Sequence, residues 1–412
     1  MDTMRLLGRE LMTSGAELKR VEDTLARLVK NSAFLTNDEK LAFDIQVTIN
    51  SIFLRSDRQV VDFVTITNRN YDLQRISELN QLSREYAQQN ISISELQLMI
   101  EKKKKSVVRY SKNWLAYALL SASLITILGG SFIQIVLAAL VGILTNQIFL
   151  FLQNNIINNI FLSEICATFF SGGIGALIGT FFHLDPTLIY IATIIPLVPG
   201  ILLTNGFHDL LEGYYVSGPI MILESLTTLA SLSIGVTLVS MIPFVPMGSG
   251  YLMITKVPLI IHIFGSMICS IAFGVTVNTK RELFLPIGVA GAFTWCTYVL
   301  SLMIIDNSFI NSFLCIVVLS LISHYFAKKF RVPLTMFFVP ALVAVVPGIT
   351  LFLEFDQWII TNKFDTQAIL GNILFSLIGM ACGSLVGDEI FKLLFKIRRW
   401  FYEIFTKLYS GN

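Results

Sequence analysis

The sequence predicts a polytopic α-helical membrane protein: about ten transmembrane helices, built as two inverted repeats of about five, with a small N-terminal α+β cytoplasmic domain. The 412 residues are 54% hydrophobic and 14% charged, with a mean hydropathy of +0.70, which is too apolar for a soluble domain. Apolar stretches of spanning length recur after residue 113. Two of these stretches are interrupted by a Pro-Gly pair, at Pro199-Gly200 and at Pro347-Gly348.

Residues 1–112 are assigned to the cytoplasmic domain. Apolar positions across residues 4–28 follow heptad spacing, which predicts one amphipathic helix. Alternation of apolar and polar residues over 43–53 predicts a strand with one buried face. Residues 60–67 predict a second strand, so a hairpin is expected with its turn at residues 56–58.

The remainder of this domain is predicted to be helical. Helical spacing over residues 73–86 predicts one helix, and Ser92 with Glu95 forms a capping box that begins another. The domain has no histidine and no glycine-rich loop, so we assign it docking, oligomerisation or regulation rather than catalysis. Residues 1–20 are amphipathic and lack the apolar core of a signal peptide, so the N-terminus is expected to stay in the cytoplasm.

A basic run from Lys102 to Lys112 precedes the first apolar stretch and places this flank in the cytoplasm by the positive-inside rule. The predicted spans are residues 114–131, 132–152, 160–182, 187–205, 219–243, 257–276, 283–305, 308–327, 333–352 and 368–387. We assign the first membrane repeat to residues 113–250 and the second, with a basic tail, to 251–412. If the spans alternate, the basic loops and the tail fall on one side, so both termini are expected in the cytoplasm of a multi-pass plasma-membrane protein.

The two Pro-Gly pairs also predict an internal repeat. They are 148 residues apart (348 minus 200), and the same displacement carries Trp114, at the start of the first span, to His262 near the start of the sixth. Each half then holds about five spans, and an odd number inverts the second half in the membrane. Inverted repeats let a carrier alternate between inward-open and outward-open states around a midplane site.

The helix breaks are the predicted substrate site. A broken helix leaves backbone N–H and C=O groups that lipid cannot satisfy, and the N-terminal end of a half-helix attracts a carboxylate. The predicted substrate-binding residues are Pro196, Pro199, Gly200, Asn205, Asp209, Glu224, Pro340, Pro347 and Gly348. Two alternatives stay open: the prolines only kink helices for packing, and Asn205, Asp209 and Glu212 belong to a solvated loop.

Glu224 and Asp209 are the predicted proton-coupling residues. Glu224 lies inside the fifth predicted span, where an ionisable group is costly and tends to face the interior or a cavity. It could pair with a substrate ammonium or carry a proton. Glu164 and Asp388 are weaker candidates, because snorkelling to the membrane interface explains them equally well.

Other chemistries find little support in the sequence. The four histidines are scattered without metal-ligand spacing, and the five cysteines have no CxxC pattern, so no metal, disulfide or cofactor is expected. Gly172, Gly173, Gly175 and Gly179 are interpreted as a close-packing helix face rather than a phosphate loop. We expect no enzyme activity and no nucleic-acid partner.

Three stretches resemble the threonine/serine exporter family. They are Gly8 to Glu22, with its Gly15-Ala-Glu17 and Arg20-Val-Glu22; Pro196 to Glu224, with Asp209, Gly213 and Ser217-Gly218; and Pro340 to Gly348 followed by Gly383 to Glu389. The resemblance covers nearly the whole chain and implies the fused form of a carrier that is split into two subunits elsewhere in the family. One departure is the wider spacing of Pro340 and Pro347, which breaks strict equivalence with the PxxPG of the first half.

The resemblance implies proton-coupled export of small hydroxylated amino acids such as threonine and serine, with the lipid bilayer, protons and a homo-oligomer as expected partners. Split-chain relatives are associated with dicarboxylates, so export of a succinate-like molecule on the same scaffold is the alternative. A membrane-bound enzyme or sensor is the third and least favoured hypothesis.

Overall fold

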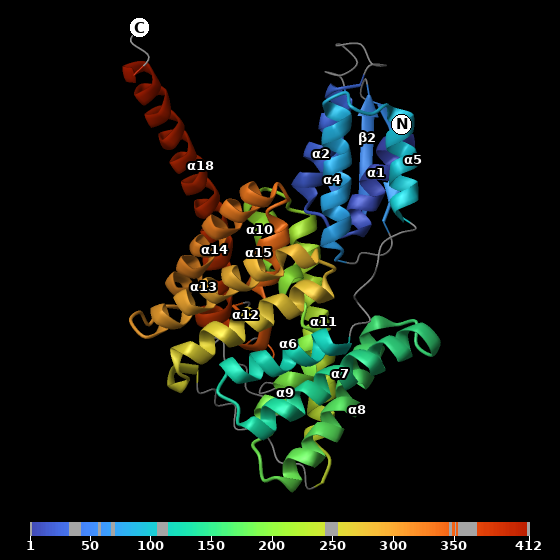
Figure 1. Ribbon diagram of the computed structural model, residues 1–412. Coiled ribbons are helices and arrows are strands. Elements are labelled where there is room, and N and C mark those ends of the chain that lie inside the picture. The colour runs from blue at the N-terminus through green and yellow to red at the C-terminus, as the bar shows by residue number, and fades with distance from the viewer. Residues whose placement is uncertain are drawn as a thin grey trace.

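The computed structural model describes residues 2–32, 43–56, 59–66, 71–104, 114–243, 254–345, 348–350, 352 and 369–409. Two parts are distinguished in Figure 1: an N-terminal lobe of helices around a small sheet, and a larger body of packed helices. The lobe and the C-terminal end of the chain lie on the same side of the helical body.

The N-terminal lobe begins with two helices where the sequence predicted one. Helix α1 (Asp2–Thr13) and helix α2 (Leu18–Lys30) are separated by a turn in which Gly15 has φ +78. Glycine adopts this left-handed conformation without the penalty of a Cβ, so the prediction of a continuous helix was wrong at this point. Both helices still bury their heptad positions.

The sheet has three strands instead of the predicted hairpin. Strands β1 (Phe43–Thr48), β2 (Ser51–Ser56) and β3 (Gln59–Thr65) pair antiparallel in the order β1-β2-β3. A turn at Ile49-Asn50 divides the predicted first strand, and the buried positions shift from Val47 to Ile52 and Leu54. The middle of the predicted second turn, Asp57-Arg58, lies outside the described residues.

Helices α4 (Leu73–Ala87) and α5 (Ile93–Lys104) complete the lobe, and the predicted capping box at the start of α5 is confirmed. The Ser92 N–H donates to the Glu95 carboxylate at 2.7 Å, and the Glu95 N–H donates to Ser92 Oγ at 3.3 Å. These bonds satisfy N–H groups that have no partner inside the helix.

The helical body contains seven helices that are long and apolar enough to cross a membrane within the described ranges, together with two shorter apolar helices. Each predicted span coincides with helical residues in the described chain, while the total of ten crossings stays a prediction. The elements are α6 (Trp114–Ile127), α7 (Phe132–Asn155), α8 (Ile160–Phe181), α9 (Thr187–Ile194), α10 (Gly200–Leu211), α11 (Ser217–Ser240), α12 (Leu259–Thr276), α13 (Phe284–Leu302), α14 (Ser308–Phe330), α15 (Thr335–Leu342) and α18 (Phe375–Tyr409).

The two halves of this body pack in the same pattern. In the first half α6, α7 and α8 pack in sequence, α8 packs on α11, and α9 contacts all of α6, α7 and α8. In the second half α12, α13 and α14 pack in sequence, α14 packs on α18, and α15 contacts α12, α13 and α14. The halves join where α6 packs against α12. Their inverted relation in the membrane stays a prediction.

The glycine face of α8 packs closely at two of its four positions. A Cβ on Gly175 would lie 2.7 Å from Val141 Cγ2, and one on Gly179 would lie 2.5 Å from Ile189 Cδ1. Gly173, in contrast, has nothing within 4 Å of the position of its missing Cβ. The packing interpretation is therefore confirmed for the second pair.

The lobe shares a hydrophobic core with the helical body. The buried cluster of α1, α2, α4 and the sheet also includes residues of α13 and α15, among them Ile287 and Phe337. Two backbone hydrogen bonds reinforce this contact, from Leu73 N–H to Val277 O at 3.0 Å and from Gln74 N–H to Asn278 O at 3.1 Å. The core of the lobe is thus continuous with the second half of the helical body.

Candidate functional site

The first predicted helix break is present. Helix α9 ends at Ile194, a 3-10 turn covers Ile195–Leu197, and Val198 turns out of the helical path with ψ 122. Pro199 then caps α10, which begins at Gly200. Proline removes a backbone donor and clashes with the preceding turn, which explains why the helix stops here.

The second predicted break is present in its described part. Helix α15 contains Pro340 and ends at Leu342, turn residues follow, and helical residues resume at Gly348. Pro347 lies outside the described residues. Both interruptions therefore fall where the Pro-Gly pairs predicted them.

Residues beside the two breaks share buried clusters. Ile195, at the start of the first interruption, and Val345, within the second, belong to one buried cluster. Leu203 and Phe352, which follow the two interruptions, belong to a second buried cluster. Both interrupted helices therefore contribute to the same buried clusters.

A cleft lies where these helices meet the N-terminal lobe. Its volume is about 270 Å³ including the open mouth, and it is narrow. Helix α10 contributes Asn205 and helix α15 contributes Thr335 and Val339, while the turn between α1 and α2 contributes Glu17, and α2 contributes Arg20. Segments from both halves of the body and from the lobe therefore border one space.

Two polar groups at this cleft have no hydrogen-bond partner among the described residues. They are the Thr335 hydroxyl, on a side chain that is 5% exposed, and Arg20 Nε. Arg20 Nη2 makes a long contact of 3.5 Å to the Glu17 carboxylate. Buried donors without partners are rare, and the cleft is therefore suited to a polar guest.

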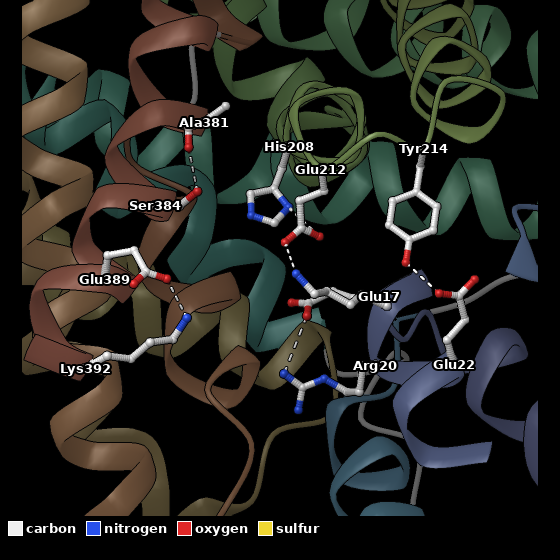
Figure 2. A network of polar contacts seen from close by, with 11 residues as sticks. Glu17, Arg20, Glu22, His208, Glu212, Tyr214, Ala381, Ser384, Glu389 and Lys392 are labelled. Carbon is white, nitrogen blue, oxygen red and sulfur yellow. Dashed lines mark hydrogen bonds and ion pairs between the residues drawn. The ribbon is translucent and has the colours of Figure 1, made fainter. Parts of the chain in front are cut away.

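A polar network joins the lobe to the loop after α10 (Figure 2). Lys19 Nζ pairs with the Glu212 carboxylate at 2.6 Å, and the Tyr214 hydroxyl donates to Glu22 at 2.8 Å. The Ile49 N–H donates to Ser217 Oγ at 3.1 Å. The family-like stretches around Glu22 and Ser217, far apart in the sequence, therefore meet at this junction. Tyr214 had no signal in the sequence that could have identified it.

The charges in this network perturb their neighbours. The hydrogen bond to Glu212 raises the pKa of Lys19, against the opposing effect of burial. Burial and the bond to Glu22 raise the pKa of the Tyr214 phenol. Both groups therefore keep their protons across the physiological pH range.

We expect Lys19→Gln to loosen the lobe slightly. The Lys19 side chain is 59% exposed, so solvent screening limits the loss to about 1 kcal/mol or less. Amide hydrogen exchange of α2 should increase modestly. Because the pKa of Lys19 is raised above 10.5, the pair's contribution is complete at neutral pH and disappears only as the pH rises past that value. Lys392→Gln, in an exposed pair on α18, is the control and should leave α2 unchanged.

Three possible metal ligands lie together on α10 and just beyond its end. Ligand atoms of His208, Asp209 and Glu212 lie within 4.8 Å of one another. The i, i+4 spacing of His208 and Glu212 could have indicated this group of possible metal ligands in the sequence, but the sequence analysis missed it. Glu212 already forms an ion pair with Lys19, so its charge is compensated at the contact between the lobe and the helical body.

The predicted carboxylates differ in their surroundings. Asp209 is buried, with 5% of its side chain exposed, but it does not line the cleft. Glu224 was expected to face the interior or a cavity, and its side chain is exposed on α11 rather than buried in the helical body. The direction of a side chain on a helix depends on its position around the helix axis, so a carboxylate within an apolar helix need not point inward. Its role in binding or coupling stays a prediction.

The two weaker candidates are better anchored than snorkelling side chains. Glu164 is only 5% exposed and contacts hydroxyls of α11. Asp388 on α18 accepts hydrogen bonds from Ser320 Oγ at 2.7 Å and contacts His324 Nε2 at 2.9 Å, both on α14. The snorkelling explanation is therefore wrong for Glu164.

Comparison with known families covers most of the chain. The family model described as "Putative threonine/serine exporter" matches residues 2–242, and that described as "Threonine/Serine exporter, ThrE" matches residues 262–390. No curated protein and no solved structure gave a match. The two matches follow one another along a single chain, the first covering the lobe and the first half of the body and the second covering most of the second half. With these matches, and with the family-like stretches meeting at one junction, the protein belongs to the threonine/serine exporter family in its fused, two-half form.

Proposed function

We propose that this protein is a secondary active exporter of small amino acids such as threonine and serine, which works by alternating access around its two broken helices. The observation that carries the proposal is the shared cleft: α10 follows one break, α15 precedes the other, and both border it together with the lobe. In carriers built from repeats, substrate sites lie at interrupted helices where the repeats meet.

The cleft offers partners for each group of a hydroxylated amino acid. The guanidinium of Arg20 suits the substrate carboxylate, and the Glu17 carboxylate suits the ammonium. Thr335 and Asn205 can exchange hydrogen bonds with a side-chain hydroxyl.

From this mouth the substrate passes to the break residues. The start of α10 at Gly200, beside Pro196 and Pro199, presents backbone N–H groups and the positive end of a helix dipole to a carboxylate. Pro340 and Gly348 are the proposed counterpart in the second half, together with Pro347 as predicted from the sequence. The narrow cleft implies that the turn between α1 and α2 moves when substrate enters.

We propose the plasma membrane as the location, with the lobe and both termini in the cytoplasm and protons as the coupling ion. The basic run before α6 supports the orientation, and the position of the lobe and the C-terminal end on one side of the body is consistent with it (Figure 1). Glu224 and Asp209 remain the proposed proton-coupling residues from the sequence.

Dicarboxylate export is the second candidate, supported by the same Arg20. A dianion would benefit from the guanidinium, but Glu17, which contacts it, would repel the second carboxylate. Efflux of labelled threonine from proteoliposomes, with serine and succinate as competitors, separates the two. Competition by succinate but not by serine would select the dicarboxylate carrier, and no efflux of any of the three would exclude both.

We expect Thr335→Val to raise the KM for threonine about fivefold to tenfold. The change is nearly isosteric, so it removes one hydroxyl without opening the cleft, and one lost hydrogen bond is worth about 1 kcal/mol. Thr335→Ser keeps the hydroxyl and should therefore have the wild-type KM. Thr227→Val, at an exposed position of α11, is the matched control. Unchanged KM in Thr335→Val and Arg20→Gln would remove the cleft from the transport path.

A further inference from the structure

Glu164 occupies a closely packed seam between α8 and α11. Its carboxyl contacts Ser231; one turn later Thr168 faces Gly235, where an added Cβ would lie 1.9 Å from Thr168 Oγ1. A further turn along, Gly172 faces Val239 at an ordinary van der Waals distance. Because Gly235 has no side chain, the two helices can approach closely at this point. The close approach encloses the Glu164 carboxyl between them.

The partners of this carboxyl are hydroxyl groups. Thr228 Oγ1 lies 3.3 Å from Oε1, and Ser231 Oγ makes a short hydrogen bond to Oε2. In the part of the chain that the structure describes, no lysine, arginine or histidine forms an ion pair with Glu164. A buried carboxylate without a cation is costly in a membrane helix, so the neutral acid fits this site better.

The hydrogen bonds of Ser231 are compatible with both protonation states of Glu164. Its Oγ lies 2.7 Å from the Thr228 carbonyl, which can only accept, and also contacts Glu164. A hydroxyl has one proton, so when Ser231 donates to the carbonyl, its contact with Glu164 requires a proton on the carboxyl. When Glu164 is ionised, the same hydroxyl can rotate and donate to the carboxylate. The seam therefore has a hydrogen-bond arrangement for each state.

A route leads from this acid toward the surface. Glu224, Thr228 and Ser231 are spaced i, i+4 and i+7 along α11, which places them on one face of the helix. Glu224 is exposed at one end of this row, and its carboxyl interacts electrostatically with that of Glu164. The row therefore places an exposed acid on the same helix face as the two hydroxyl groups that contact the buried acid.

We propose that Glu164 carries the coupled proton of the transport cycle and that Glu224 exchanges this proton with the solution. The inference rests on the proposed function, because it assumes proton-coupled export. The proton enters at the Glu224 carboxyl from one side of the membrane and passes by way of the Thr228 hydroxyl to the Glu164 carboxyl. It leaves through the same groups after the alternating-access change has exposed them to the other side. Glu164 is neutral while α8 and α11 are packed as observed.

The test compares two activities of the full-length protein in proteoliposomes. One is accumulation of labelled threonine driven by a pH gradient, and the other is threonine counterflow at equal pH, which needs no net proton movement. Glu164→Gln mimics the neutral acid, so it should keep counterflow within about twofold of wild type and lose the stimulation by the pH gradient. Glu224→Gln should slow the driven reaction at least about threefold and retain its dependence on the gradient. Glu101→Gln, an exposed acid on α5, is the control.

The outcomes separate this inference from the function on which it rests. If wild type moves threonine without any response to the gradient, proton coupling fails, and Glu164 loses its proposed role with it. If wild type responds and Glu164→Gln responds equally, the inference alone is overturned. Loss of both activities in Glu164→Gln would assign the residue a structural role. Uncoupling by Glu224→Gln alone would show that Glu224, and not Glu164, carries the coupled proton.

Discussion

Filling the first helix break is expected to abolish transport. In the double variant Pro199→Ala/Gly200→Ala, two residues that disfavour a helix interior by about 3 and 1 kcal/mol are replaced by the best helix former. The interruption after Leu197 should then be shortened or lost, and α10 should shift relative to the cleft. A displacement of about 1 Å at a reacting or binding group can reduce turnover about a hundredfold. We therefore expect threonine efflux in proteoliposomes to fall at least about a hundredfold.

Pro219→Ala is the matched control for this variant. Pro219 lies in the first turn of α11, where the missing N–H has no partner within the helix, so its replacement should leave both fold and efflux close to wild type. Thermal unfolding in detergent shows whether the double variant folds. A double variant that folds and exports threonine at the wild-type rate would contradict the proposed role of the break.

Removing Arg75 is expected to destabilise the N-terminal lobe by about 3–5 kcal/mol. The Arg75 and Glu10 side chains are 4% and 10% exposed, and Nη2 of Arg75 donates to Glu10 at 3.1 Å and to the Ile100 carbonyl at 3.0 Å. Arg75→Met would leave the Glu10 charge buried without this partner, which is the costly way to break a buried ion pair. Amide hydrogen exchange of α1 and α4 in the full-length protein should rise sharply.

Two comparisons test the cause of that loss. The double variant Arg75→Met/Glu10→Met removes both charges and should recover much of the protection, because apolar residues can replace a buried pair with little loss. Lys392→Gln breaks a pair whose side chains are 66% and 74% exposed and should change stability by less than about 0.5 kcal/mol. A double variant as unstable as Arg75→Met would show that lost packing, and not the loss of the ion pair, is responsible.

Local rules predicted the class of the protein and its interruptions. Runs of apolar residues determine where spanning helices form, because lipid cannot satisfy an open backbone. Pro199 and Pro340 predicted the interrupted helices, because a proline lacks the backbone N–H donor and this affects the helix within one turn. The errors were local as well. The turn at Gly15 divides the predicted first helix, and the turn at Ile49-Asn50 divides the predicted first strand. The sequence analysis missed both turns because the hydrophobic spacing continues through them.

The direction of the charged side chains required the tertiary structure. Glu224 and Glu164 each lie inside an apolar helix, and the sequence favoured Glu224. The packing of α8 on α11 buries Glu164 and leaves Glu224 exposed. Which face of a fully apolar helix is covered depends on its neighbours, because such a helix has no polar side to orient it.

The sequence by itself therefore determined a membrane carrier of a particular family, its apolar helices and its two breaks. Only the tertiary structure decided which distant residues form a site: it brought Glu17 and Arg20 of the lobe to Asn205 and Thr335 of the broken helices. Spacing along one chain records local hydrogen bonding and hydrophobicity, whereas contacts between segments more than a hundred residues apart depend on how the elements pack.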